Sequence, residues 1–184
     1  MAVKPILRMG HPVLRVPAAP YPVSEIDTPE FAALIQDLRD TLVDAGGIGL
    51  AAPQIGVSYQ VVIVDIPAGP SRYGELSALG FSVFINPKLT PLSTEKQSYW
   101  EGCLSVPGLR GLVSRPSVVQ IDYLSDESVN QRRTFTGFPA TVIQHELDHL
   151  TGTLYIDHIE DRSLIAFESE YETFHSASTP PTGI

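Results

Sequence analysis

The segment QHELDHL, residues 144–150, has the residue types and the spacing that could hold a divalent metal ion. His145 and His149 lie four residues apart, so a helix would bring both imidazoles to one side, and Glu146 follows the first of them. At about 100° per residue, this carboxylate falls within an arc of apolar side chains, with the histidines at its edge. A buried carboxylate is costly unless it meets a cation, a hydrogen-bond donor or a water held by a metal. The segment therefore predicts a helix that carries a metal site.

The alternative is that the pattern arises by chance, because a histidine on an apolar helix face is usually a core residue. A third ligand would decide between these two interpretations, since catalytic divalent sites usually take three protein ligands and leave one position for water or substrate. The longer HExxHxxGxxH pattern needs a histidine where Tyr155 stands, although Gly152 matches it. The downstream glutamates are Glu160, Glu168, Glu170 and Glu172. They lie in a polar segment that favours a solvated face, which leaves Cys103 as the stronger candidate.

Cys103 stands in the segment YWEGCLSVPG, residues 99–108. Strand alternation would put Tyr99, Glu101, Cys103 and Ser105 on one face. A lone cysteine is more often a buried, inert thiol, and a single one excludes an internal disulfide. A third segment, GIGLAAPQIG at residues 47–56, joins flexible glycine backbone to the side-chain amide of Gln54.

The composition of the whole chain favours one ordinary domain with a sizeable core, because 43% of its 184 residues are hydrophobic. A net charge of −9 argues against general affinity for DNA or for anionic membranes. The first residues lack the apolar stretch of a signal peptide, and no segment is long enough to span a bilayer. These features predict a cytoplasmic protein.

The pattern of apolar residues predicts the elements that position these motifs. Asp27 or Thr28 can cap a helix that begins at Pro29 and ends at the glycine pair 46–47. Strands are expected at residues 61–64, 82–85, 117–123 and 133–138, with a loop at 67–80. The metal-motif helix should begin near Pro139 and end before Gly152. A last helix, capped by Asp161, should extend through about residue 174, and the tail 176–184 is expected to be mobile.

The three motifs GIGLAAPQ, EGCLS and QHELDH resemble the signature motifs of the peptide deformylase family, in the same order. Weaker similarity extends from residue 6 to about residue 154. Gly47, Gly49 and Ala52 also satisfy a GxGxxA dinucleotide fingerprint, but a helix precedes them where a strand is needed, and Pro53 interrupts the following helix. We therefore expect an α+β fold, with antiparallel sheets packed around a central HExxH helix, an N-terminal and a C-terminal helix, and one catalytic domain over residues 1–175.

The resemblance implies that the chain removes the formyl group from the N-terminal formylmethionine of newly made polypeptides, releasing formate through a metal-bound water. Cys103, His145 and His149 would hold the metal, which lowers the pKa of that water and polarises the formyl oxygen. Glu146 would take the water proton and pass it to the departing amine. The family's oxyanion donors correspond to the side-chain amide of Gln54 and the backbone N–H of Leu104.

The resemblance also implies a path for the substrate, which would lie extended between two backbone segments. The matching backbone positions are Ile48, Gly49 and Gly102, and the matching positions for the methionine pocket are Tyr99, Phe138 and Val142. The three side chains of that pocket could equally be ordinary core. Arg110 and Arg115 could pair with Glu101 or touch the peptide, although a solvated surface role is the usual one.

One thiolate and two imidazoles suit zinc, iron, nickel or cobalt, so the ligand types alone do not choose the metal. The resemblance implies Fe2+ in the cell, with Zn2+, Ni2+ or Co2+ possible after isolation. Two other functions share part of these features. A general zinc metallopeptidase would use the same helix, and a structural zinc domain would add His158 as a fourth ligand.

Three features depart from the family pattern. His11 stands where aspartate is frequent, and residues 67–80 could hold a short insertion. The C-terminal segment is acidic, whereas some family members dock on the ribosome through a basic C-terminal helix. Ribosomal RNA would repel an acidic segment, so such docking is not expected here.

Overall fold

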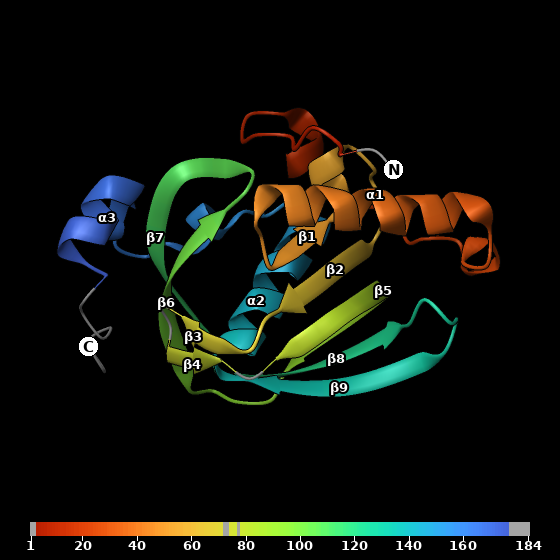
Figure 1. Cartoon of the computed structure of the whole chain (residues 1–184). Helices are drawn as coiled ribbons and strands as arrows, with labels where there is room; N and C mark the ends of the chain where they lie inside the picture. Colours follow the sequence, from red (N-terminus) through yellow and green to blue (C-terminus); the bar gives the residue numbers. More distant parts are fainter. Residues whose placement is uncertain (1–2, 72–73, 77, 177–184) are drawn as a thin grey trace.

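The computed structural model describes residues 3–71, 74–76 and 78–176, and its strands form antiparallel sheets (Figure 1). The five-stranded sheet has the order β1-β2-β5-β8-β9, with the strands Gly49–Ala51, Val61–Ile66, Leu79–Pro91, Val118–Leu124 and Asn130–Thr136. The three-stranded sheet has the order β10-β7-β6, with Ile165–Phe167, Val106–Pro116 and Lys96–Cys103. Strands β3 (Gly69–Ser71) and β4 (Gly74–Leu76) form a hairpin.

The helices are α1 (Pro29–Ala45), α2 (Gly137–Leu150) and α3 (Glu168–Phe174). Short 3-10 helices span Pro12–Arg15, Val23–Glu25, Ala52–Ile55, Tyr155–His158 and Arg162–Leu164. Antiparallel sheets around α2, with one helix before it and one after it, confirm the predicted α+β fold.

Helix α2 is enclosed by both large sheets, and it contacts strands of each (Figure 1). Eleven of its residues are buried, so the helix is buried nearly all round instead of along one arc as the apolar pattern indicates. It begins two residues before the predicted start, at Gly137, whose φ of +62° suits glycine, and Pro139 lies in its first turn. Because the helix is enclosed, both of its histidines are shielded from water.

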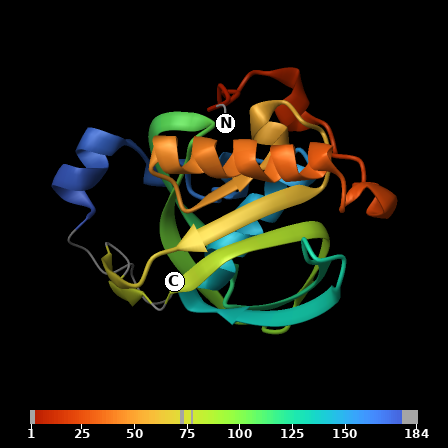
Figure 2. The same cartoon turned by 45° about the vertical axis from the view of Figure 1, so that its right-hand side comes forward.

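Helix α1 confirms the prediction made from its caps. The Thr28 hydroxyl accepts a hydrogen bond from the Phe31 N–H at 3.3 Å, and Gly46 ends the helix with a φ of +64°. This helix packs on the face of the five-stranded sheet opposite α2 (Figure 2). In β2, Val61 and Ile63 face α1, whereas the alternate valines face α2. Burial on both faces explains why residues 61–64 of this strand are a continuous apolar run.

Three predictions about elements are wrong. The strand predicted at residues 133–138 is β9, Asn130–Thr136, and residues 137 and 138 are already part of α2. Residues 67–80, predicted as a loop, contain the β3–β4 hairpin and the start of β5 at Leu79, although residues 72, 73 and 77 lie outside the described part. A strand of three residues that contains glycine or proline shows no alternation of apolar and polar side chains. Such strands form through backbone pairing, which the sequence pattern does not reveal. The last helix is also shorter than predicted. Asp161 accepts from the Ser163 N–H at a 3-10 turn, and residues 165–167 pair with β7 before α3 begins.

The prediction of a mobile tail concerns residues 176–184, of which all but Ser176 lie outside the described residues. Within the described ranges, no helix is long and apolar enough to cross a membrane.

Candidate active site

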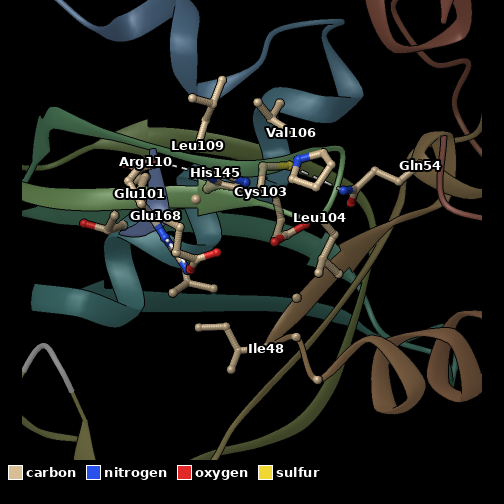
Figure 3. A pocket seen from close by; sticks show the side chains of 18 of the residues that line it. Ile48, Gln54, Glu101, Cys103, Leu104, Val106, Leu109, Arg110, His145 and Glu168 are labelled. Carbon is tan, nitrogen blue, oxygen red and sulfur yellow. Dashed lines mark hydrogen bonds and ion pairs between the residues drawn. The ribbon is translucent and has the colours of Figure 1, made fainter. Parts of the chain in front are cut away.

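The side chains of Cys103, at the end of β6, and of His145 and His149, in the C-terminal half of α2, converge on one point. Figure 3 shows the first two of them. One ligand atom from each lies within 4.8 Å of the others, and the Cys103 Sγ is 3.3 Å from the His149 Nε2. Two donors on one tetrahedral ion, with bonds of about 2.0–2.3 Å, lie roughly 3.3–3.8 Å apart. The three atoms are therefore close enough to share one ion with small adjustments.

An irregularity in the β6–β7 pairing determines the position of the Cys103 thiol. The register shifts between Glu101 and Cys103, and Cys103 then pairs with Val106 across a tight turn. Ser105 therefore lies in the turn instead of continuing the alternation, and its N–H donates to the Cys103 Sγ at 3.4 Å. Burial disfavours the thiolate, but the neighbouring His149 and His145 outweigh it and lower the pKa of Cys103 to about 5. A thiolate is the form of cysteine that binds metals.

His145 is held by a buried acid. Its Nδ1 lies 2.8 Å from a Glu101 carboxylate oxygen, which leaves Nε2 for the cluster. Glu101 in turn accepts from the Arg115 guanidinium at 2.6 and 3.0 Å. Burial opposes the charge of Glu101, but these hydrogen bonds from His145 and Arg115 lower its pKa. Of the alternatives that the sequence leaves open for Arg115, pairing with Glu101 is the one observed.

The same network extends to the far side of α2. The Arg115 Nη1 donates to Asp148 at 2.8 Å, and the Nε2 of His158 lies 2.9 Å from the same carboxylate oxygen. His158 thus contacts an acid, and among the described residues it is not in the cluster of potential metal ligands. This geometry gives no support to a four-ligand cage.

Glu146 lies beside the cluster with a carboxylate oxygen that lacks a partner. Its Oε2 is buried and has no hydrogen bond within the described part of the chain. Burial raises the pKa of Glu146 to about 7, although the nearby His145 and His149 act in the opposite direction. A Cβ at Gly49 would collide with this carboxylate, so glycine is required for the close approach. A buried oxygen without a partner beside a thiolate and two imidazoles fits a site that takes up a cation with its water.

Gln54 approaches the thiol from the 3-10 helix Ala52–Ile55, and its side chain is fixed at both ends. The Oε1 accepts from the Ala51 N–H at 2.8 Å, whereas Nε2 lies 3.2 Å from the Ser105 hydroxyl and 3.7 Å from the Cys103 Sγ. No role of this kind is predicted for Ser105 from the sequence. Its place in the EGCLS motif, two residues after the cysteine, is the signal that could have found it. Leu104 lies between Cys103 and Ser105 in the chain and lines the cavity.

A cavity of ≈ 650 Å³ opens onto the cluster. It is lined by most of the residues that the sequence assigns to substrate: Ile48, Gly49, Gly102, Phe138 and Val142. Tyr99 does not line it. The Tyr99 ring instead packs edge-on against Phe138, with the ring centroids 5.5 Å apart. Arg110 and Glu168 line the same cavity, whereas the polar sequence around Glu168 predicts a solvated face for it.

The chain is similar to known proteins over most of its length. The family model described as polypeptide deformylase matches residues 3–164. The chain belongs to the peptide deformylase family. Peptide deformylase 1 of Nitrosomonas europaea is 48% identical over 159 residues, which cover 86% of this chain and 89% of that protein.

Solved deformylase structures agree in fold. The class I type b peptide deformylase from Acinetobacter baumannii with bound Met-Ala-Ser has a TM-score of 0.81 and 35% identity, covering 86% of this chain and 99% of that one. The enzyme from Synechococcus elongatus in complex with actinonin has a TM-score of 0.76 and 36% identity, covering 88% and 83%. The chain is thus a metal-dependent hydrolase of protein biosynthesis that removes the formyl group from N-terminal formylmethionine.

Proposed function

We propose that Cys103, His145 and His149 hold the divalent ion of this deformylase, and that Glu146 carries the proton of the reaction. The observation that supports this most strongly is the convergence of the three ligand atoms beside a buried, partnerless oxygen of Glu146. When bound, the ion supplies Lewis-acid activation of the water and of the formyl oxygen.

Glu146 is placed to move a proton at its Oε2. Its carboxylate lines the cavity and follows His145 directly in the chain, so it lies beside the ligands without being needed as one. It would take a proton from the attacking water and give it to the amine that departs with the methionine. Glu146 is buried, so bulk water has little access to this carboxylate.

Gln54 and the backbone N–H of Leu104 are the proposed donors to the negative oxygen that forms when water adds to the formyl carbon. The contacts of Gln54 with Ala51 and Ser105 fix its amide before substrate arrives. Donors that need no reorganisation stabilise the transition state most, and losing one typically costs about 10²–10³ in rate.

The walls of the cavity suit an extended peptide. Strand β1, with Gly49, is the edge of one sheet, and β6, with Gly102, is the edge of the other. Edge strands present unpaired backbone groups to which a peptide can add as a further strand. The Acinetobacter baumannii relative with Met-Ala-Ser supports a formylmethionyl peptide as the occupant. The methionine side chain would contact Phe138 and Val142, and Tyr99 would act by supporting the Phe138 ring.

The finer assignments follow from the resemblance and the ligand types. We propose Fe2+ as the ion in the cell, since one thiolate and two imidazoles accept it as readily as zinc, nickel or cobalt. Residues 1–175 would act as one catalytic domain in the cytoplasm, on nascent chains near the ribosome but without docking through the acidic α3. We expect no binding to DNA or to membranes.

The test is formate release from formyl-Met-Ala-Ser by anaerobically purified protein, with acetyl-Met-Ala-Ser beside it. The wild type should release formate and leave the acetyl peptide intact. Glu146→Gln should keep its metal, because the ligands remain, yet lose nearly all turnover. Full-rate formate release by the metal-loaded variant would show that Glu146 is not the proton carrier.

A further inference from the structure

Arg110 lies at the wall of the cavity along which the peptide is proposed to run. A Cβ at Gly102 would collide with the Arg110 guanidinium, so this cation lies directly against the backbone of the β6 edge. Among the described residues that line the cavity, Arg110 is the only lysine or arginine. A positive group in this position is able to attract an acidic side chain of the peptide.

Glu168 already contacts this guanidinium. The Arg110 Nε donates to its Oε1 at 3.1 Å, and the Nη2 also donates to the same oxygen (Figure 3). The side chains keep 17% and 41% of their exposure, so water and solutes reach the pair. In Figure 3 this pair and Gln54 lie on opposite sides of Cys103, which puts the pair away from the proposed oxyanion donors.

The C-terminal segment holds Glu168 in this position. Strand β10 pairs with β7 so that Ala166 lies opposite Arg110, and Glu168 follows two residues later at the start of α3. Helix α3 is anchored in turn, because the buried Tyr171 ring packs against Trp100 with centroids 5.3 Å apart. The pairing of β10 with β7 and the packing of α3 therefore place Glu168 at the cavity.

We propose that Glu168 is a specificity-determining residue that shields Arg110, and so weakens the recognition of peptides with an acidic side chain one or two residues after the formylmethionine. The inference rests on the proposed function, because it takes the peptide to lie along Gly102. Glu168 competes with the acidic side chain for one guanidinium, whereas a neutral peptide leaves the ion pair in place.

The test compares three amidated peptides, formyl-Met-Ala-Ser, formyl-Met-Glu-Ser and formyl-Met-Ala-Glu, as substrates of the metal-loaded wild type and of Glu168→Gln. The kcat/KM of at least one acidic peptide, divided by that of the neutral peptide, should rise by about two- to fivefold in the variant, as expected for a partly exposed ion pair. The change should appear in KM and should shrink at about 1 M salt, where the Debye length is near 3 Å. Glu168→Ala should behave in the same way.

Glu172→Gln is the matched control, because it removes the same charge from an exposed position of the same helix that does not line the cavity. Its peptide preference should equal that of the wild type. An equal shift in Glu172→Gln, or an unchanged ratio in both Glu168 variants, would overturn the proposal. A wild type that releases no formate from the neutral peptide would instead count against the proposed function.

A double variant tests whether the effect passes through Arg110. In an Arg110→Met background, Glu168→Gln should no longer change the ratio between acidic and neutral peptides, because no guanidinium remains to be shielded. The same two- to fivefold shift in that background would mean that Glu168 repels acidic peptides directly, and shielding would be rejected.

Discussion

Strand β7 carries two arginines five residues apart, and each pairs with a glutamate in a different setting. The Arg115–Glu101 pair is interior, with both side chains 5% exposed, and it continues to the Nδ1 of His145. The Arg110–Glu168 pair lies at the wall of the cavity and remains open to solvent. The same two residue types therefore serve different purposes, because burial fixes the first pair while the second is able to exchange partners.

The difference follows from the cost of an unpaired charge. Breaking a buried ion pair leaves a charge without water or a partner and typically costs about 3–5 kcal/mol, whereas exposed pairs contribute roughly 0–1 kcal/mol. The interior pair should consequently resist change and orient a metal ligand. The pair at the cavity wall should affect mainly which peptide is bound.

The largest effect is expected from Arg115→Met, which leaves Glu101 buried without its guanidinium. The free energy of unfolding should fall by about 3–5 kcal/mol. Urea unfolding of the metal-loaded proteins measures this change. Adding Glu101→Gln to the variant should recover part of the loss, since the orphan charge is then removed. A loss below about 1 kcal/mol would show that the buried pair stabilises the fold no more than the pair at the cavity wall.

A smaller effect is expected from Glu101→Gln alone, which keeps the size of the side chain but weakens its hold on the His145 Nδ1. Metal affinity should fall by about 10–100-fold, as is typical when the partner of a ligating histidine is changed. Competition with a chelator measures the affinity. Glu168→Gln is the control at the cavity wall, and it should bind metal as the wild type does.

The smallest effect is expected from Glu168→Gln on stability. Because the pair is partly exposed to solvent, the free energy of unfolding should change by less than about 1 kcal/mol. The urea midpoint at constant metal loading measures it. A loss as large as that of Arg115→Met would show that Glu168 mainly holds the C-terminal segment in place, and the contrast between the two pairs would disappear.

The sequence predicted best those elements that carry their own local signals. Helix α1 has a capping threonine, Pro29 and a terminal Gly46, and β2 is a compact β-branched run, so both were found. Strands β3, β4 and β10 have three residues each. They form by backbone pairing with a partner strand, which no local sequence pattern shows. For this reason residues 67–80 were predicted as a loop, and the last helix was predicted too long.

In the candidate site, contacts between segments that are distant in the sequence also have no local signal. The three motifs and their order were readable, and the resemblance assigned roles to them, but the contacts between them depend on the fold. The turn that brings Ser105 to Gln54, the packing of Tyr99 behind Phe138, and the pairing of Glu168 with a residue 58 positions away have no signature in spacing. The roles of the individual residues stay predictions until variants are measured.

The three-ligand site is tested most directly by the metal content of anaerobically purified variants. Wild type and His158→Ala should each hold about one ion per chain, because His158 contacts Asp148 and not the ligand cluster. Cys103→Ala and His149→Ala should lose most of the metal while remaining folded by circular dichroism. Full metal content in folded Cys103→Ala, or loss of metal in His158→Ala, would contradict the proposed three-ligand site.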